Sequence, residues 1–185
     1  MSDSSENTKP LRIATRRGDD GQTDLLFGER VSKTHPQIIA LGAVDELNSM
    51  LGVAKAFCEH KSHRRILRDV QKELVAIMGE IACPAGKEKQ YEDSPFTKMG
   101  PKALECLDAV VTHLESLPLT SPGWATPGEG RDAAFLDMAR SLTRKAEREL
   151  LSLKEKTEKP IRPVVLQYLN RLSDLLWLLA RQAER

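Results

Sequence analysis

The chain has 185 residues, 40% of them hydrophobic and 30% charged, which is enough apolar material for one domain with a sizeable core. Its 28 basic and 27 acidic residues give a formal net charge of +1, so bulk charge does not favour a nucleic-acid or membrane partner. The three cysteines lie far apart without CxxC spacing, which argues against a disulfide framework or a zinc site. No apolar run reaches about 20 residues and no signal-peptide pattern occurs, which argues against a membrane span and predicts a cytoplasmic location.

The amino-terminal residues 1–10 are polar and acidic, which predicts a disordered tail, and we expect residues 11–185 to form a single domain. Residues 15–23, TRRGDDGQT, follow as a loop whose composition suits a polyphosphate. Its two glycines can take positive φ and turn backbone N–H groups towards one anion, and Asp19 or Asp20 could hold Mg²⁺. An ordinary surface turn is the alternative, and no Walker A lysine follows. The predicted polyphosphate contacts are Thr15, Arg16, Arg17, Gly18, Asp19, Gly21 and Thr23, with Lys33 and Arg30 as further candidates.

Five stretches carry amphipathic helical periodicity, and the segments between them are rich in turn formers. We expect helices at about 36–60, 62–83, 101–117, 130–153 and 160–185, the second with Ser62 as its N-cap. Residues 28–33 lack a regular pattern, and residues 85–100 predict a long exposed loop. With no convincing strand, the sequence predicts an all-α, up-and-down bundle of five helices, a four-helix bundle plus one.

The fourth predicted helix has the most regular pattern, with an inward-facing seam of apolar residues from Leu136 to Leu153. Beside it, Arg140, Arg144 and Arg148 recur every four residues, which stacks three guanidinium groups along one edge. Like charges at this spacing are mildly destabilising, so an anion lying against the row would explain it, while a solvated edge is the alternative. On the fifth helix, Asn170 lies on the flank of a second apolar seam.

Three blocks, in this order and spacing, resemble the PduO-type ATP:corrinoid adenosyltransferases over about Ile13 to Ala183. They are residues 15–23, residues 42–49 (GAVDELNS), and residues 139–148 (ARSLTRKAER) taken with 168–174 (YLNRLSD). The resemblance implies a ferritin-like, cobalamin adenosyltransferase-like bundle that assembles as a homotrimer with active sites between subunits. It also implies transfer of the 5′-deoxyadenosyl group of ATP to Co(I) of cobalamin, with release of triphosphate.

The same resemblance assigns roles to residues of this chain. The loop would wrap the triphosphate and Mg²⁺, and no metal ligands are predicted apart from Mg²⁺ held through the ATP phosphates. Arg144 and Asn170 would contact ATP from the adjacent subunit, with Arg148 as a helper. Asp45 and Arg140 would pair as a clamp across the interface, and Asp45, Arg140 and Arg144 make up the predicted catalytic set. Trp124 would press on the lower face of the corrin.

Some positions depart from the family pattern, more on the corrinoid side than on the ATP side. Leu41 stands where tyrosine is common, Trp124 where phenylalanine is, Glu129 where glycine is, Asp137 where histidine is, and Lys145 where arginine is. Two alternatives therefore stay open: a non-catalytic carrier of ATP or adenosylcobalamin, and a purely structural helical oligomer. The expected partners, besides the small-molecule substrates, are a flavoprotein reductase and an adenosylcobalamin-dependent enzyme, with no nucleic acid and no membrane.

Overall fold

The computed structural model describes residues 14–118 and 125–184, so the predicted tail at 1–10 and Trp124 lie outside the described residues. Within these ranges a small antiparallel hairpin precedes six α-helices. The hairpin consists of β1 (Gln22–Asp24) and β2 (Arg30–Ser32), joined through the 3₁₀ turn η1 (Leu26–Gly28). The helices are α1 (Pro36–Phe57), α2 (Lys61–Ala82), α3 (Glu88–Glu92), α4 (Pro101–Glu115), α5 (Arg131–Lys156) and α6 (Pro163–Ala183).

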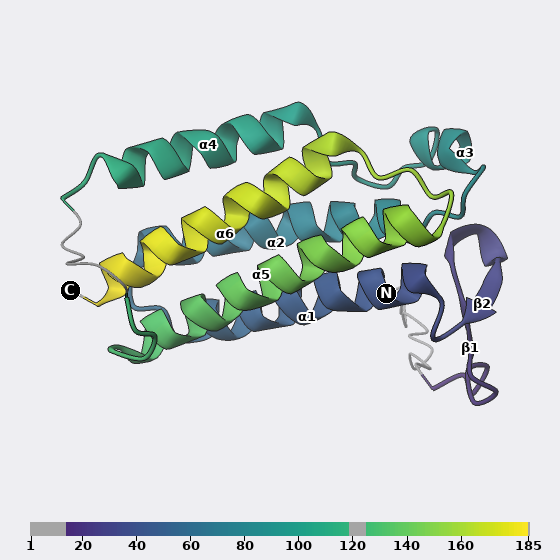
Figure 1. Ribbon diagram of the computed structural model, residues 1–185, viewed down its shortest axis with the longest axis horizontal. Helices are drawn as coiled ribbons and strands as arrows, with labels where there is room; N and C mark the ends of the chain where they lie inside the picture. Colours follow the sequence, from purple (N-terminus) through teal and green to yellow (C-terminus); the bar gives the residue numbers. More distant parts are fainter. Residues whose placement is uncertain (1–13, 119–124, 185) are drawn as a thin grey trace, which may run out of the picture.

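The five long helices lie side by side as an elongated bundle (Figure 1). Helix α5 packs against α1 and α6, α2 packs against α1, and α4 packs against α6. The hairpin and α3 lie at the end of the bundle where α1 begins, and the hairpin projects beyond the helices. The predicted all-α, up-and-down bundle is therefore confirmed.

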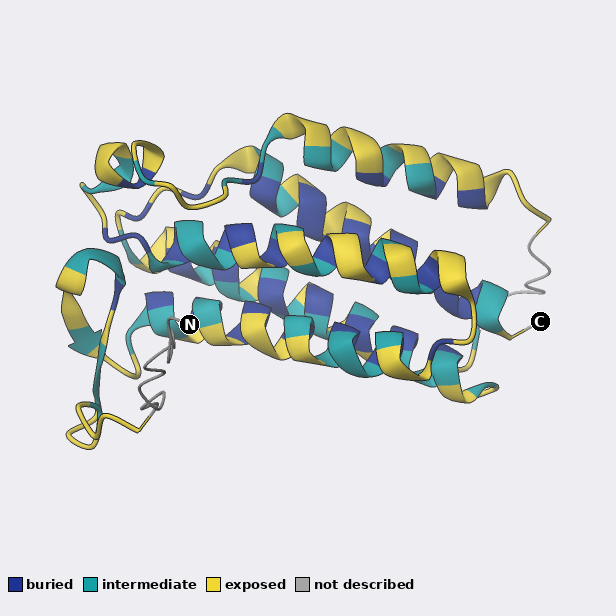
Figure 2. Ribbon diagram, turned by 180° about the vertical axis from the view of Figure 1, so that it is seen from behind, coloured by how far each residue is buried: buried dark blue, intermediate teal, exposed yellow. Residues whose placement is uncertain are grey.

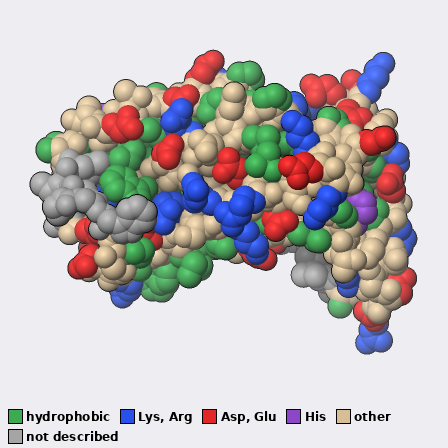
Figure 3. Space-filling model, viewed as in Figure 1, with side chains coloured by type: hydrophobic (Ala, Val, Ile, Leu, Met, Phe, Trp, Pro, Cys, Tyr) green, Lys and Arg blue, Asp and Glu red, His purple; other side chains and the backbone are tan. Residues whose placement is uncertain are grey.

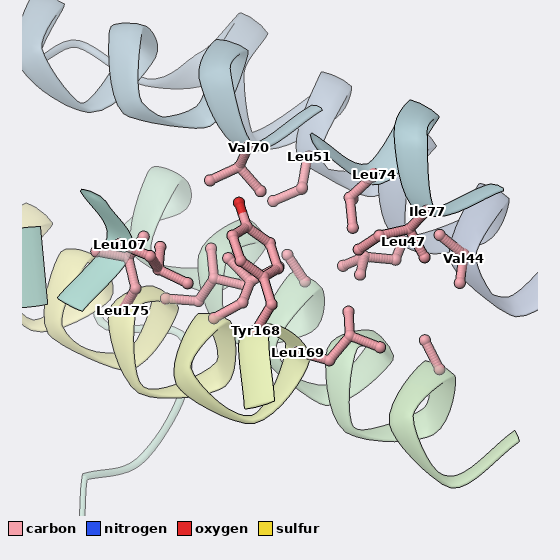
Figure 4. Close-up of a cluster of buried hydrophobic side chains, with 14 of the residues drawn as sticks. Val44, Leu47, Leu51, Val70, Leu74, Ile77, Leu107, Tyr168, Leu169 and Leu175 are labelled. Atoms are coloured by element: carbon pink, nitrogen blue, oxygen red, sulfur yellow. The ribbon is translucent and has the colours of Figure 1, made fainter. Parts of the chain in front are cut away.

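The apolar seams of the helices meet in one continuous core. Buried positions follow the inner side of the long helices, and exposed positions follow their outer side (Figure 2). On α5 all six seam residues are buried, and on α6 the seam is buried from Val165 to Leu179, with Ala183 half-buried. Tyr168 of α6 reaches across the core towards α2 (Figure 4). A buried leucine contributes roughly 1.5–3 kcal/mol by removal from water, so these seams account for most of the driving force of folding.

The structure corrects three local predictions. Residues 22–32 form a hairpin, although the sequence predicted an irregular segment at 28–33 and no strand. Glu29 and the left-handed Phe27 and Gly28 close a turn that pairs Asp24 with Arg30. Residues 85–100 contain helix α3 and are not wholly exposed.

Within 85–100, Tyr91 is buried and its ring lies on Gly79, where an added Cβ would come within 2.9 Å of the phenol oxygen. Met99 is also buried. Finally, α2 begins at Lys61, with His60 in the N-cap position and no side-chain capping bond, so Ser62 is not the cap. None of the helices in the described ranges is both long and apolar enough to cross a bilayer.

Candidate nucleotide and corrinoid site

The backbone of the glycine loop is held by hydrogen bonds to itself and to the hairpin. Gly21 has φ of +79° and its carbonyl accepts from the Lys33 N–H at 2.9 Å. Gly18 does not adopt positive φ as predicted; the left-handed residue in this part of the loop is Arg16, with φ of +58°. A side chain at Gly18 would be crowded for another reason, because an added Cβ would lie 3.1 Å from both Lys33 Nζ and the Gln22 carbonyl oxygen.

Ion pairs fasten the loop to the hairpin. Arg30 donates to the Arg17 carbonyl at 2.9 Å and pairs with Asp20 at 3.2 Å and Asp24 at 3.4 Å. Arg17 also reaches Asp24, at 3.4 Å. Asp20 accepts a further bond from the Gln22 N–H at 3.1 Å. Arg30, a candidate phosphate contact by sequence, therefore braces the loop.

Several donors in the loop remain available to an anion. Lys33 Nζ lies 2.6 Å from the Gly18 carbonyl oxygen, so the ammonium group sits against the middle of the loop. Within the described part of the chain, the backbone N–H groups of Gly18 and Asp20 have no hydrogen-bond partner, and Arg16 and Asp19 make no ion pair. Arg16, Lys33 and the two N–H groups could thus bind phosphate oxygens, and Asp19 is the carboxylate left for Mg²⁺.

The other predicted contacts lie on the helices. Arg144 and Arg148 are exposed on α5 and form no ion pair with any described residue, whereas Arg140 is half-buried. Lys and Arg side chains gather over the middle of the face in Figure 3, where α5 runs. Asn170 of α6 lies beside this row, because its amide contacts Glu147 of α5 at 3.5 Å. The row and Asn170 form an open cationic strip.

A buried ionic cluster fixes the start of this row. Asp137 is 4% exposed and accepts from Arg181 Nη2 at 2.6 Å and from Arg140 Nε at 3.3 Å. Arg181 is also buried, pairs with Glu184 at 2.7 Å, and lies 5.7 Å from the centre of the Trp177 ring. Sequence reasoning noted Asp137 as a departure but missed its partners. A charged residue between buried Leu136 and Ala139 was the available signal, because a buried carboxylate requires a cation.

The predicted clamp partners do not meet within one chain. Asp45 is exposed on α1 and has no ion-pair partner among the described residues, while Arg140 is directed to Asp137. On the same face of α1 and α5, Glu46 pairs with Lys145 at 2.5 Å, so Lys145 takes part in an intrachain contact. The prediction of an Asp45–Arg140 pair between subunits is not tested by a single chain.

The loop and the cationic strip occupy different places in the chain. The loop lies at the end of the bundle, whereas the strip lies along the middle of α5. Both ribbon views show that the loop is separate from the middle of α5 (Figures 1 and 2). Thr15 and Thr23 lie in or next to the loop, with Thr23 paired to Val31 in the hairpin. No group of three or more His, Cys, Asp or Glu residues within 14–118 and 125–184 is arranged to hold a metal ion.

Comparison with known proteins points to one family. The sequence profile of the family described as cobalamin adenosyltransferase matches residues 13–183. Corrinoid adenosyltransferase PduO of Salmonella typhimurium is 38% identical over 176 residues, which is 92% of this chain and 49% of that protein. The chain therefore spans about half the length of this relative. Cobalamin adenosyltransferase of Cupriavidus metallidurans is 34% identical over 175 residues, covering 94% of this chain and 89% of that protein.

Solved structures give the same result. A PduO-type ATP:corrinoid adenosyltransferase variant from Lactobacillus reuteri, complexed with cobalamin and ATP, superposes with a TM-score of 0.83 at 30% identity. The match covers 94% of this chain and 93% of that chain. Another variant of the L. reuteri enzyme, complexed with ATP, gives a TM-score of 0.81 at 29% identity, covering 94% of each chain.

Proposed function

The chain belongs to the cobalamin adenosyltransferase family, and from this membership we propose that it transfers the 5′-deoxyadenosyl group of ATP to the cobalt of reduced cobalamin. The observation that carries the proposal is the extent of the family match, which includes the glycine loop, the α5 arginine row and Asn170 in one continuous region. In the reaction, the electron pair of Co(I) forms a bond to the ribose C5′ atom, the C5′–O5′ bond breaks, and triphosphate leaves with that bonding pair.

The loop is proposed to bind the triphosphate. Its support is three donor groups without a partner among the described residues, namely the N–H groups of Gly18 and Asp20 and the guanidinium of Arg16. The Lys33 ammonium, which donates to the Gly18 carbonyl at 2.6 Å, lies against the same loop. Mg²⁺ bound to the phosphates would neutralise charge on the leaving triphosphate, with Asp19 as the protein carboxylate that fits it. The bracing of Asp20 by Arg30 keeps the loop in shape before ATP arrives, which lowers the entropic cost of binding.

The arginine row is proposed to stabilise the leaving group. Because the nucleophile is the substrate's own cobalt, the protein needs no serine, cysteine or general base, and its task is to position ATP and to offset developing negative charge. Arg144 and Arg148 are exposed and form no ion pair with any described residue, so both guanidinium groups are free to bind the phosphates of ATP. Asn170 would orient the nucleotide from α6.

We propose that the complete site forms between subunits of a homotrimer. Two observations support it: the loop and the row lie apart in one chain, and Asp45 has no ion-pair partner among residues 14–118 and 125–184. The outer faces of α1 and α5 also carry exposed apolar side chains, Ile39 at 46% and Met138 at 52%, which are suited to burial against another copy. Asp45 would then meet Arg140 of a neighbouring subunit.

Several finer assignments stay proposals. By analogy with the family, the corrinoid would contact Trp124, which lies outside the described residues. The exposed Phe57 stacks on Phe135, with 5.0 Å between the ring centres, and supports an apolar surface where α5 begins. A single domain over 11–185 is supported by one shared core, and a cytoplasmic location by three free thiols. The reductase and the adenosylcobalamin-dependent recipient enzyme rest on the family resemblance.

The experiment that tests the function is anaerobic. Purified protein, ATP, Mg²⁺ and chemically reduced cobalamin are mixed, and the Co–C bond is followed by its absorbance while triphosphate is quantified. One triphosphate per adenosylcobalamin is expected. Binding of ATP without turnover would instead favour the carrier, an alternative kept because Asp137 and Glu129 change the corrinoid side of the family pattern.

A further inference from the structure

Five cationic side chains share one face of the first half of α2. Their spacing of i, i+3, i+4, i+7 and i+11 is that of a single helix face, and this α2 basic face consists of Lys61, Arg64, Arg65, Arg68 and Lys72. Arg64 is half-buried and the other four are exposed. Helix α2 begins at the end of the bundle opposite the hairpin and packs against α1, so this face is separate from the glycine loop and from the arginine row of α5 (Figure 1).

Most of the charge on the α2 basic face has no countercharge. Lys72 pairs with Asp69 at 2.9 Å, whereas the other four cations form no ion pair with a residue in 14–118 or 125–184. The hydrogen bond from Lys72 lowers the pKa of the Asp69 carboxyl, slight burial opposes this, and the charges of Arg65 and Arg68 lower the pKa further. The carboxyl therefore lies in a positive potential.

This arrangement of charge works against the stability of the helix. Like charges four positions apart repel each other, and the face contains the pairs 61 and 65, 64 and 68, and 68 and 72. The amino terminus is also the positive end of the helix dipole, yet α2 has no acidic residue in its first turn. A bound anion would remove both penalties, so the face is suited to an anionic ligand.

The recess beside these side chains indicates which kind of anion fits. Its volume is about 430 Å³, and the described residues that line it are the five cations and Asp69, with none that is apolar or aromatic. It therefore offers no stacking surface for a nucleobase and no apolar centre of the kind found in stable protein interfaces. Guanidinium groups bind phosphate oxygens through paired N–H bonds, and side chains four apart on a helix lie about 5–6 Å from each other, which suits linked phosphate groups.

We propose that the α2 basic face binds a compact condensed phosphate such as inorganic triphosphate. Arg64, Arg65 and Arg68 are the central phosphate ligands, and Lys61 and Lys72 lie at the two ends of the face. The reaction proposed above releases triphosphate, but the inference rests on this face alone and holds whether or not the chain transfers the adenosyl group.

Calorimetric titration of the full chain with sodium tripolyphosphate, without Mg²⁺, tests the site. The parent protein carries Gly21→Val, so that the glycine loop contributes little to the binding. Saturable binding is expected, tighter than that of pyrophosphate and much tighter than that of orthophosphate, because a longer anion contacts more of the cations. Orthophosphate that binds as tightly as tripolyphosphate would overturn the proposal.

Two triple variants of this parent localise the binding. Arg64→Gln, Arg65→Gln and Arg68→Gln together should weaken tripolyphosphate at least about tenfold, the loss expected from three exposed ion pairs. The matched control replaces three exposed cations that form no ion pair with a described residue, and should keep the parent affinity; it combines Lys89→Gln, Lys154→Gln and Lys156→Gln. An equal loss in both triple variants, or no loss in the arginine variant, contradicts the assignment.

Urea unfolding separates phosphate binding from a role in the fold. Without phosphate, the arginine variant should have a midpoint at least as high as its parent, because glutamine has a similar helix propensity and the repulsion is relieved. Tripolyphosphate should raise the midpoint of the parent and not that of the variant. A lower midpoint of the variant without phosphate would mean that these arginines serve the fold. Preferential binding of phosphatidylglycerol vesicles or duplex DNA at equal phosphate concentration, lost in the variant, would also contradict the proposal.

Discussion

Replacing Asp137 with alanine should destabilise the protein more than any exposed ion pair does. Its side chain is 4% exposed and that of Arg181 is 5% exposed, so both charges are almost fully removed from water. Breaking a buried pair costs about 3–5 kcal/mol because a desolvated charge is left behind. Arg181 would keep Glu184 at 2.7 Å and the Trp177 ring, so we expect the lower end, about 3 kcal/mol.

Urea unfolding at one protein concentration measures this cost. With an m-value of about 2 kcal/mol/M, the midpoint should fall by about 1.5 M. The control is Asp69→Asn, which removes an exposed pair with Lys72 and should change stability by no more than about 0.5 kcal/mol. A double variant, Asp137→Leu with Arg181→Met, should be more stable than either single variant, because both nearly fully buried charges are removed together, whereas Arg140 and Glu184, which also lose a partner, are partly exposed.

The reasoning would be refuted by an Asp137→Ala midpoint close to that of Asp69→Asn, or by strictly additive effects in the double variant. Additivity would mean that Asp137 and Arg181 contribute independently. In that case the 2.6 Å contact between them would not be the source of the stability.

Three further predictions concern the loop, one histidine and the clamp. Gly21→Val forces a branched residue to φ of +79° and should reduce ATP affinity, measured by calorimetry, at least about tenfold with unchanged helix content. The control Gly100→Ala, at an ordinary φ, should leave ATP affinity unchanged. Equal affinities of the two variants would remove the loop from the site. Burial lowers the pKa of His63 below 6.5, so the unfolded state takes up the proton first as the pH falls. The free energy of unfolding should therefore decrease from pH 7.5 to 5.5, by at most about 1.4 kcal/mol per pH unit. A His63→Asn variant with the same pH dependence would contradict this. Asp45→Ala should weaken assembly and activity together, as seen by analytical ultracentrifugation and the adenosylation assay, and an intact, active assembly would leave the Asp45–Arg140 pairing without support.

The His63 prediction has a clear structural basis. Its Nε2 atom lies 3.1 Å from Gln182 Oε1, a contact that the neutral ring makes when its proton is on Nε2. Its Nδ1 atom is buried without a hydrogen-bond partner in the described part of the chain, so a second proton would find no acceptor there. Burial is the largest cause of the lowered pKa, and the neighbouring His60 ring, 4.8 Å away, adds to it, whereas the hydrogen bond to Gln182 and the charge of Asp132 oppose it.

Periodicity predicted the long helices and their buried seams because each seam repeats at the helical spacing and faces one core. It could not predict the hairpin, whose strands of three residues depend on the left-handed Phe27 and on Arg30 bridging Asp20 and Asp24. Those contacts are set by three-dimensional proximity and leave no repeating pattern. Tyr91 was assigned to an exposed loop for the same reason, since its burial depends on the space above Gly79.

The sequence predicted which segments contribute to the candidate site, but not the contacts that their side chains make with one another. The loop and the arginine row were visible from residue type and spacing, and Asn170 does lie beside the row. The partners of Asp137 could not be found from sequence, because Arg181 is 44 positions away and no pattern links the two residues. Positive φ was expected at Gly18 but occurs at Arg16, and at Gly18 the absence of a side chain leaves room for the close approach of Lys33.

The central claim is that adenosyl transfer uses the loop of one subunit and the arginine row of another. The most direct test mixes a loop-defective chain, Gly21→Val, with a row-defective chain, Arg144→Ala, after unfolding and reassembly in equal amounts. The ATP concentration is kept low enough that neither variant alone has measurable activity. Random assembly into cyclic trimers gives about one quarter of the sites an intact loop and an intact row, so Co–C bond formation should return to about 25% of the wild-type rate. No recovery above the single variants, with assembly intact, would contradict the account.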